Sequence, residues 1–342
     1  MSSDKWDRGK EKYMKKKITL ITLCAMLFTP SLPVEAQQQP AKIPRIGWLT
    51  SGVISTMSDR QEAFRQGLRE LGYVEGKNIL IEWRGADNIP ERRRTFAEEI
   101  VRLKVDVIVT AGSDTTRIVK AATSTIPIVM ASSDDPVGSG LVASLARPGG
   151  NITGLSQLSP ELNGKRLEIL KEVIPKLTRV AVFSTSRATD HEQVMQEIEH
   201  AAAAFGVKLQ HLDVLTTKDI EPAFRLAIKA RADAVLENIS GPIRTAYLRE
   251  LAELAVKNGL PVMRERPEHV EAGGLMAYRV NLNDLARRAA TYVDKILKGT
   301  KPADLPVEQP TKFEFIINLK AANQIGLTIP PNVLARADKV IR

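Results

Sequence analysis

Small polar residues follow the apolar segments of this chain, and they are residue types that recognise a small charged solute. In the first half they are Ser51, Gly112, Ser113, Thr115, Ser133, Asp134 and Asp135, and in the second half Thr185, Asn238 and Glu265. Hydroxyls and free backbone N–H groups at the start of a helix suit a carboxylate. Asp134 or Asp135 could pair with an ammonium group, and the sequence does not decide between them. The set fits an amino-acid zwitterion or a related small carboxylate.

Catalytic and cofactor motifs are missing from the sequence. The four histidines are scattered, and no spacing of Cys or His suits a metal. There is no G-x-S-x-G elbow and no P-loop. Residues 138–143 do fit G-x-G-x-x-A and are predicted to open a helix, but they follow the fourth expected strand, whereas a dinucleotide fold places this motif after the first. We therefore expect a protein without cofactor, metal site or enzymatic activity. An exported hydrolase that uses Asp134 and Asp135 as acid and base is the alternative.

The composition and charge of the chain limit the kinds of partner that it can bind. The 342 residues carry 49 Lys and Arg against 40 Asp and Glu, a net charge of +9, but only 5% are aromatic. The excess basic residues are dispersed, so we expect no nucleic-acid surface. The 43% hydrophobic content is that of an ordinary globular chain with a sizeable core.

The N-terminal segment reads as an export signal. Lys15, Lys16 and Lys17 precede an apolar run at 18–28, two prolines follow, and Ala36 offers a small residue for cleavage. Residues 1–36 are therefore predicted to be a cleaved signal peptide, with Met14 as a possible true start. The run is too short for a membrane span, and Cys24, the only cysteine, would leave with the signal. We expect an exported, soluble mature protein without a disulfide.

The remaining chain alternates strands and helices in two rounds, as a parallel, doubly wound sheet does. The first round predicts strands at 46–49, 78–83, 105–110 and 127–131, with helices at 59–71, 90–103 and 115–122. The second predicts strands at 180–183, 208–214, 234–239 and 261–264, with helices at 191–205, 219–230 and 243–258. Residues 45–51 resemble 179–185, and 126–130 resemble 260–264, both 134 positions apart. We expect two similar lobes, with the ligand beyond the carboxyl ends of the strands.

Several stretches closely resemble the ABC-transporter substrate-binding proteins of the tryptophan/aromatic-type group, a branch of the type I periplasmic-binding-protein fold. They are FRQGLRELGYVEG at 64–76, AATSTIPIV at 121–129, DPVG at 135–138, LARPGGNITG at 145–154, EAGGLMAY at 271–278 and QPTKFEFIINLK at 309–320. Together they run through nearly the whole mature chain.

The resemblance implies a non-enzymatic periplasmic receptor that hands a small solute to an inner-membrane ABC permease. We expect this receptor to be a monomer. It implies three hinge crossings, which we place near 154–160, 274–278 and 300–306, with Tyr278 covering the ligand. Lobe 1 is then expected at 37–157 plus 276–303, and lobe 2 at 158–275 plus 304–342. A sensor subunit that reports ligand binding to a membrane receptor has the same sequence features and stays open as an alternative.

Overall fold

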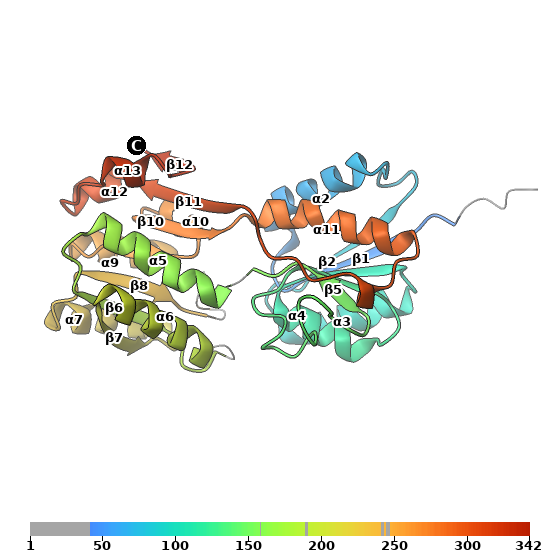
Figure 1. The fold of residues 1–342 in the computed structure, drawn as a ribbon, viewed down its shortest axis with the longest axis horizontal. Coiled ribbons are helices and arrows are strands. Elements are labelled where there is room, and N and C mark those ends of the chain that lie inside the picture. Colours follow the sequence, from blue (N-terminus) through green and yellow to red (C-terminus); the bar gives the residue numbers. More distant parts are fainter. Residues whose placement is uncertain (1–41, 158, 189–190, 241–242, 244–246) are drawn as a thin grey trace, which may run out of the picture. The chain divides into compact units, whose positions relative to one another are not determined.

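The computed structural model describes residues 42–157, 159–188, 191–240, 243 and 247–342. The predicted signal peptide lies outside the described residues. Within them, no helix combines the length and the apolar character that crossing a bilayer requires. Residues Ile43–Arg342 form one unit that contains two separate β-sheets (Figure 1).

The smaller sheet, with its covering helices, is called lobe 1. Its order is β2-β1-β3-β4-β5, and every neighbouring pair is parallel. The strands are β1 (Arg45–Thr50), β2 (Leu80–Gly85), β3 (Val107–Ala111), β4 (Ile128–Ser132) and β5 (Ile152–Gly154). The helices are η1 (Ile54–Met57), α2 (Ser58–Glu70), α3 (Pro90–Arg102), α4 (Ser113–Ala122), the later α11 (Leu282–Leu297) and η3 (Pro302–Asp304).

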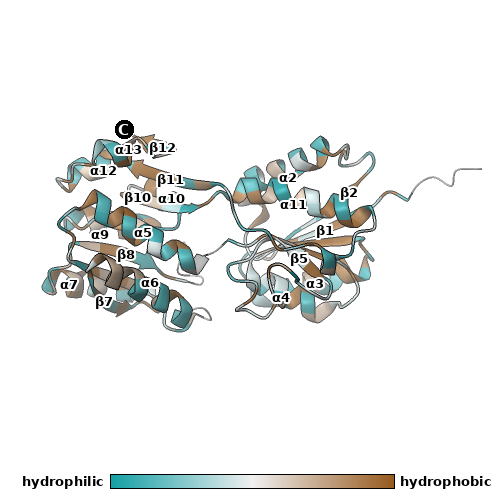
Figure 2. Ribbon diagram, viewed as in Figure 1, coloured by the Kyte–Doolittle hydropathy of each residue, from teal (hydrophilic) through white to brown (hydrophobic). Residues whose placement is uncertain are grey.

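Successive side chains of the lobe 1 strands point to opposite faces of the sheet, which gives the lobe two apolar layers. Val107 and Val109 pack with α2 and α11 on one face of the sheet, whereas Ile108 packs with α3 and α4 on the other. A strand covered on both faces has no polar side, which is why its sequence is continuously apolar. Figure 2 shows these strands as hydrophobic ribbons between helices of mixed hydropathy.

The larger sheet, with its helices, is called lobe 2. Its order is β12-β11-β10-β9-β8-β6-β7, and only β10 and β11 are antiparallel. The strands are β6 (Arg179–Ser184), β7 (Lys208–Asp213), β8 (Ala234–Asn238), β9 (Val262–Arg264), β10 (Met276–Val280), β11 (Phe313–Asn318) and β12 (Lys339–Ile341). The helices are α5 (Ser159–Val173), α6 (His191–Phe205), η2 (Thr217–Asp219), α7 (Ile220–Lys229), α9 (Leu248–Lys257), α10 (Pro267–Glu271), α12 (Leu319–Gln324) and α13 (Pro331–Leu334).

The prediction of two similar doubly wound lobes is confirmed. β1 and β6 begin and end 134 residues apart, and each begins at an arginine whose backbone N–H donates to an aspartate carboxylate. These bonds join Arg45 to Asp106 at 2.8 Å and Arg179 to Asp233 at 2.9 Å. The first residue of β1 and the first residue of β6 are thus held by the same kind of hydrogen bond.

The chain passes between the sheets three times, and two passages differ from the expected positions. β10 pairs with β9 and β11 in the larger sheet, while α11 packs on α2, so the second passage follows Val280 rather than lying at 274–278. Residues 276–280, expected in lobe 1, extend the lobe 2 sheet instead. The third passage lies between Glu308, which bridges to Leu155, and β11, because η3 still contacts β5. The other lobe boundaries stay a prediction.

Candidate functional site

The loops after β3 and β4 bring together most of the polar residues expected in lobe 1. Gly112 adopts φ 94°, a conformation that favours glycine, and its N–H donates to Ser132 at 2.9 Å just before α4 begins. The Ser113 hydroxyl lies 3.0 Å from the Ser133 hydroxyl and accepts a hydrogen bond from the Asp134 N–H at 3.0 Å. These residues converge at the N-terminal end of α4, where a helix favours negative charge.

The Asp134 side chain faces this hydroxyl group and the first passage between the lobes. Its Oδ2 accepts from the Ser113 hydroxyl at 3.3 Å, and its Oδ1 accepts from the Gln157 amide at 3.4 Å. The Gln157 N–H also donates to the Ser133 carbonyl at 2.7 Å. A carboxylate of lobe 1 is therefore hydrogen-bonded to the hinge segment.

Asp135 has a different environment. Its Oδ1 accepts from the N–H groups of Val137 at 3.2 Å and Gly138 at 2.9 Å, so the carboxylate stabilises its own loop. A Cβ on Gly138 would lie 2.0 Å from Asp135 Oδ2, which explains the glycine. The helix predicted to start at this glycine motif is wrong, because residues 136–140 form turns held by this carboxylate. Of the two aspartates, the geometry favours Asp134 as the ligand partner.

Two further predicted residues of lobe 1 have no side-chain partner among the described residues. The Thr115 hydroxyl, in the first turn of α4, is buried without one. Ser51 contributes its backbone, whose carbonyl accepts from the Asn88 N–H at 2.6 Å and joins the loops after β1 and β2. Around these loops Val53, Ile89 and Val137 are large exposed apolar residues. The carboxyl edge of the sheet thus combines polar groups with apolar surface.

Of the predicted residues of lobe 2, one has a structural role and two are half-buried at the ends of their strands. The Thr185 hydroxyl donates to the Val214 carbonyl and accepts from the Ser240 N–H, both at 3.1 Å, so it ties three loops together. Asn238 ends β8, and Glu265 directly follows β9; both are half-buried. They lie at the carboxyl edge, as the sequence predicts.

Tyr278 lies in β10, shortly before the second passage between the lobes. Its ring stacks on Phe313 at 5.8 Å with an interplanar angle of 10° and meets Phe315 edge-on at 6.2 Å. It packs against apolar clusters of both lobes, and burial raises the pKa of its phenol. Tyr278 therefore belongs to the hinge.

Sequence reasoning missed the arginines near this edge. Arg166 on α5 is 1% exposed, and its Nε donates to the Tyr278 carbonyl at 2.9 Å. Burial lowers the pKa of Arg60 to about 10; Arg279 and Arg266 nearby act in the same direction. The sequence does contain a sign that Arg166 is buried, because helical spacing places it on the same apolar face as Leu162, Leu170 and Val173.

A buried ion pair lies beneath the lobe 2 loops. Arg264 at the end of β9 is fully buried and pairs with Glu237 on β8, which is 3% exposed. Glu237 Oε1 also accepts from the Tyr247 hydroxyl and the Ile239 N–H, each at 3.1 Å. This pair fixes the strand ends that carry Asn238 and Glu265.

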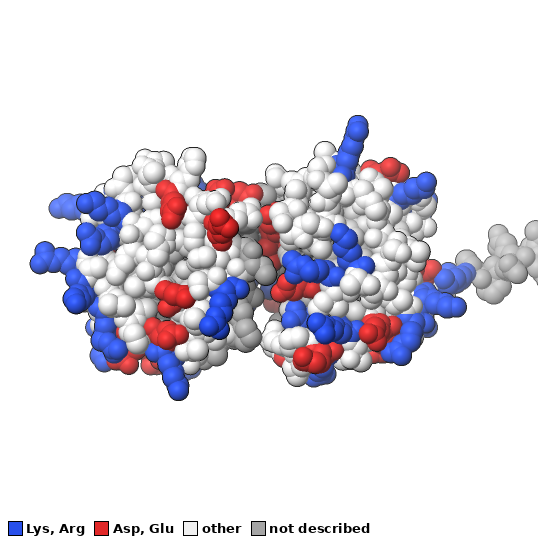
Figure 3. Space-filling model, turned by 90° about the horizontal axis from the view of Figure 1, so that it is seen from below, with Lys and Arg blue, Asp and Glu red and all other residues white. Residues whose placement is uncertain are grey.

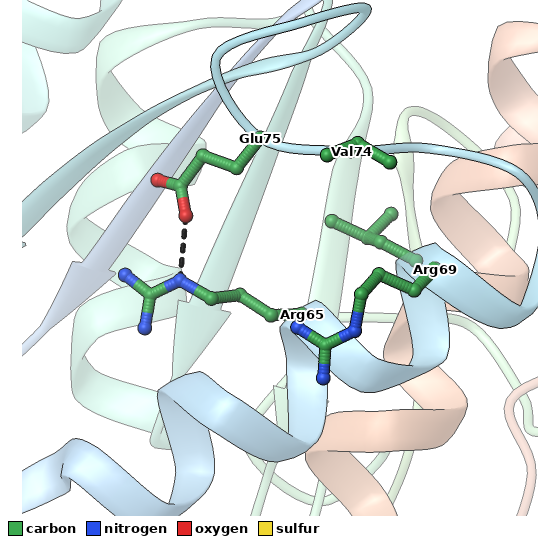
Figure 4. Close-up of a pocket in the computed structure, with 5 residues that line it drawn as sticks. Arg65, Arg69, Val74 and Glu75 are labelled. Carbon is green, nitrogen blue, oxygen red and sulfur yellow. Dashed lines mark hydrogen bonds and ion pairs between the residues drawn. The ribbon is translucent and has the colours of Figure 1, made fainter.

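A hollow of about 240 Å³ on lobe 1 lies apart from these loops. It is lined by α2 and the following loop, with Arg65 directed at Glu75 across it (Figure 4). Glu75 also accepts from the Trp83 indole at 2.9 Å, and Arg69 pairs with Glu62. Since its charged groups satisfy one another, we do not assign the ligand to this hollow.

Two α/β lobes linked by three chain passages, with polar loops at the carboxyl edges of parallel sheets, define the type I periplasmic-binding-protein fold. The family model for ABC transporter substrate binding protein matches residues 54–341, and the chain belongs to this family.

Individual proteins agree with that assignment. A tyrosine-binding protein of Clostridioides difficile (strain R20291) is 27% identical over 265 residues, 77% of this chain and 75% of that protein. The structure of a conserved domain protein from Vibrio cholerae is similar with a TM-score of 0.77 and 28% identity, over 87% of this chain and 100% of that one. An ABC domain in complex with L-Trp from Streptococcus pneumonia gives a TM-score of 0.74 and 26% identity, over 86% and 100%.

Proposed function

We propose that this protein is exported to the periplasm, binds an amino acid with a bulky apolar side chain between its lobes, and delivers it to an ABC permease without chemical change. The observation that carries the proposal is the hydrogen-bonded group of Ser113, Ser133, Asp134 and Gln157. It supplies hydroxyls, a helix N-terminus and a carboxylate, the donors and acceptors that a zwitterionic head group needs.

The apolar part of the ligand follows from the neighbouring surface. Val53, Ile89 and Val137 come from three loops of the same sheet edge and are exposed. An aromatic or long aliphatic side chain would cover such residues and remove apolar area from water. One relative is named for tyrosine and a similar structure holds L-Trp, which supports these two amino acids as first candidates.

The mechanism rests on two arrangements of the lobes. A ligand that contacts both lobes favours the closed arrangement by its difference in affinity for the two states. Tyr278 packs against both lobes and is placed to follow this motion. The closed form then presents one surface to the permease.

Calorimetric titration of the purified protein with L-tyrosine, L-tryptophan and L-phenylalanine tests the proposal, with L-glutamate and glucose as controls. In a thermal unfolding assay, a true ligand present at 100 times its Kd should raise the free energy of unfolding by about 2.7 kcal/mol. Asp134→Asn should weaken binding about tenfold or more. Asp114→Asn, which removes an exposed carboxylate paired with Arg117, should not.

Two results would contradict the proposal. Absence of binding to every amino acid would remove the ligand class, and turnover of a bound compound would indicate an enzyme. Uptake of the bound amino acid by cells with and without the gene tests the permease partnership. Normal uptake together with a lost cellular response would favour a sensor subunit.

A further inference from the structure

Arg166 is a buried cation whose contacts are neutral. The side chain is 1% exposed; Nε donates to the Tyr278 carbonyl at 2.9 Å, and Nη1 donates to the Asn163 amide oxygen at 2.8 Å. These bonds engage two of the five N–H donors of a guanidinium group. No carboxylate of the described residues lies within ion-pair distance of it. A buried charge without a counter-ion is unfavourable.

Further charged residues surround this part of the hinge. Three neighbouring arginines have their own carboxylates: Arg264 pairs with Glu237, Arg279 with Glu314 at 2.9 Å, and Arg266 with Glu268 at 3.7 Å. The remaining acid is Glu265, half-buried after β9. It raises the pKa of both Arg60 and Arg166 against the lowering effect of burial, as Glu268 also does for Arg60 and Glu237 for Arg166.

These five arginines and four glutamates are called the arginine cluster. Its member Arg166 is buried, and no carboxylate of the described residues lies within ion-pair distance of it. The cluster lies at the hinge, since Arg166 holds the carbonyl of Tyr278 and Tyr278 packs on both lobes. Leu162, one helical turn before Arg166, packs with the apolar cluster of lobe 1.

We propose that Arg166, at the centre of the arginine cluster, determines specificity for a ligand that carries a carboxylate, whose negative charge compensates this buried cation. The inference rests on the proposed function and orients the amino acid: its carboxylate faces Arg166, and its ammonium group faces Asp134. The sequence alone associates a carboxylate with hydroxyls and free backbone N–H groups at the start of a helix, without specifying the helix. The hydroxyls at the start of α4 remain neutral partners of the head group.

Binding of L-tyrosine and of L-tyrosinamide, which lacks the carboxylate charge, tests the assignment by calorimetry. The acid should bind wild-type protein about 10- to 100-fold more tightly than the amide. Arg166→Met should reduce this ratio at least tenfold, and Arg166→Lys should restore part of it. Lys165→Met is the matched control, because it removes a cation at the preceding position of α5, where Lys165 pairs with Glu168 on the surface. Its ratio should equal that of the wild type.

Glu265→Gln provides a test of opposite sign that does not depend on the buried arginine. Removing this carboxylate takes away a negative charge that acts on Arg166, so the acid-to-amide ratio should rise about tenfold. An unchanged or lower ratio would refute the inference, as would Arg166→Met weakening acid and amide equally, which is the result of a purely structural arginine. If the wild type binds no amino acid at all, the proposed function fails as well; binding without a charge-dependent ratio leaves that function intact and removes only the role of the cluster.

Discussion

His269 should make the protein lose stability in mild acid, because it is buried in its neutral form. The side chain is fully buried on α10, and burial together with the nearby Arg264 lowers its pKa from 6.5 to about 3. Its ring packs directly on Gly274, where an added Cβ would lie 2.0 Å from Nε2. The site therefore has little space to relax around an imidazolium ion.

The direction and size of the effect follow from proton linkage. Between pH 6.5 and pH 3 the unfolded chain binds a proton on this histidine and the folded chain does not, so stability falls as the pH falls. Each pH unit below 6.5 costs about 1.4 kcal/mol, so lowering the pH from 7 to 5 costs about 2 kcal/mol through this group. The loss ends near pH 3, where the folded protein also becomes protonated.

Urea unfolding of wild type and His269→Gln at pH 7, 6 and 5 measures this loss. The variant should be less stable than the wild type at pH 7. Between pH 7 and pH 5 its free energy of unfolding should fall by about 2 kcal/mol less than that of the wild type. His211→Gln is the matched control, since His211 lies on the surface beside Glu199 and should leave the slope close to that of the wild type. Equal slopes for wild type and His269→Gln would refute the reasoning.

Three other substitutions test packing and buried charge. The Asp233 carboxylate accepts hydrogen bonds from the backbone N–H groups of Thr178 and Arg179, and although burial opposes them, these bonds keep its pKa lowered. Asp233→Asn should therefore lower the free energy of unfolding by about 1–2 kcal/mol above pH 4 and by progressively less below it, as measured by urea unfolding. Gly67→Ala should lower stability by about 2 kcal/mol, because the Cβ would lie 2.3 Å from the Arg287 carbonyl between α2 and α11; Gly164→Ala, with its nearest contact at 3.5 Å, should be tolerated in the same thermal unfolding assay. Glu237→Gln should cost about 3–5 kcal/mol by leaving Arg264 buried without its carboxylate, and adding Arg264→Met should recover part of that loss; a double variant no more stable than the single one would contradict this.

Much of the fold follows from local pattern. The strand at β3 is continuously apolar because Val107, Ile108 and Val109 are covered on both faces, and the 134-residue offset between β1 and β6 is visible in the residues themselves. The hydrophobic pattern of the sequence could not predict that β10 and β11 pair as antiparallel strands. The two strands are 32 residues apart with α11 of the other lobe between them, so their pairing is decided by tertiary contacts.

The candidate site was predictable in part for a similar reason. The carboxyl ends of parallel strands meet at one edge, which brings Ser113, Ser133 and Asp134 together as expected. The sequence could not separate Asp134 from Asp135, because the difference is a turn in which Asp135 binds the N–H groups of its own loop. Nor does residue type reveal Arg166, since arginines are usually exposed and only its position on an apolar stripe marks it as buried.

The hinge connects the binding residues to the lobes through paired backbone rather than through loose linkers. In the first passage, the Ser156 N–H donates to the Glu308 carbonyl at 2.9 Å, and the Glu308 N–H donates to Gly154 at 3.0 Å, which joins it to the third passage. Gln157 binds Asp134, and Arg166 binds the carbonyl of Tyr278 just before the second passage. Each passage is therefore held by a candidate ligand-binding residue or by another passage. Such a hinge favours rotation of intact lobes over local unfolding. A carboxylate bound at Arg166, as we propose, would then act directly on the segments that join the lobes.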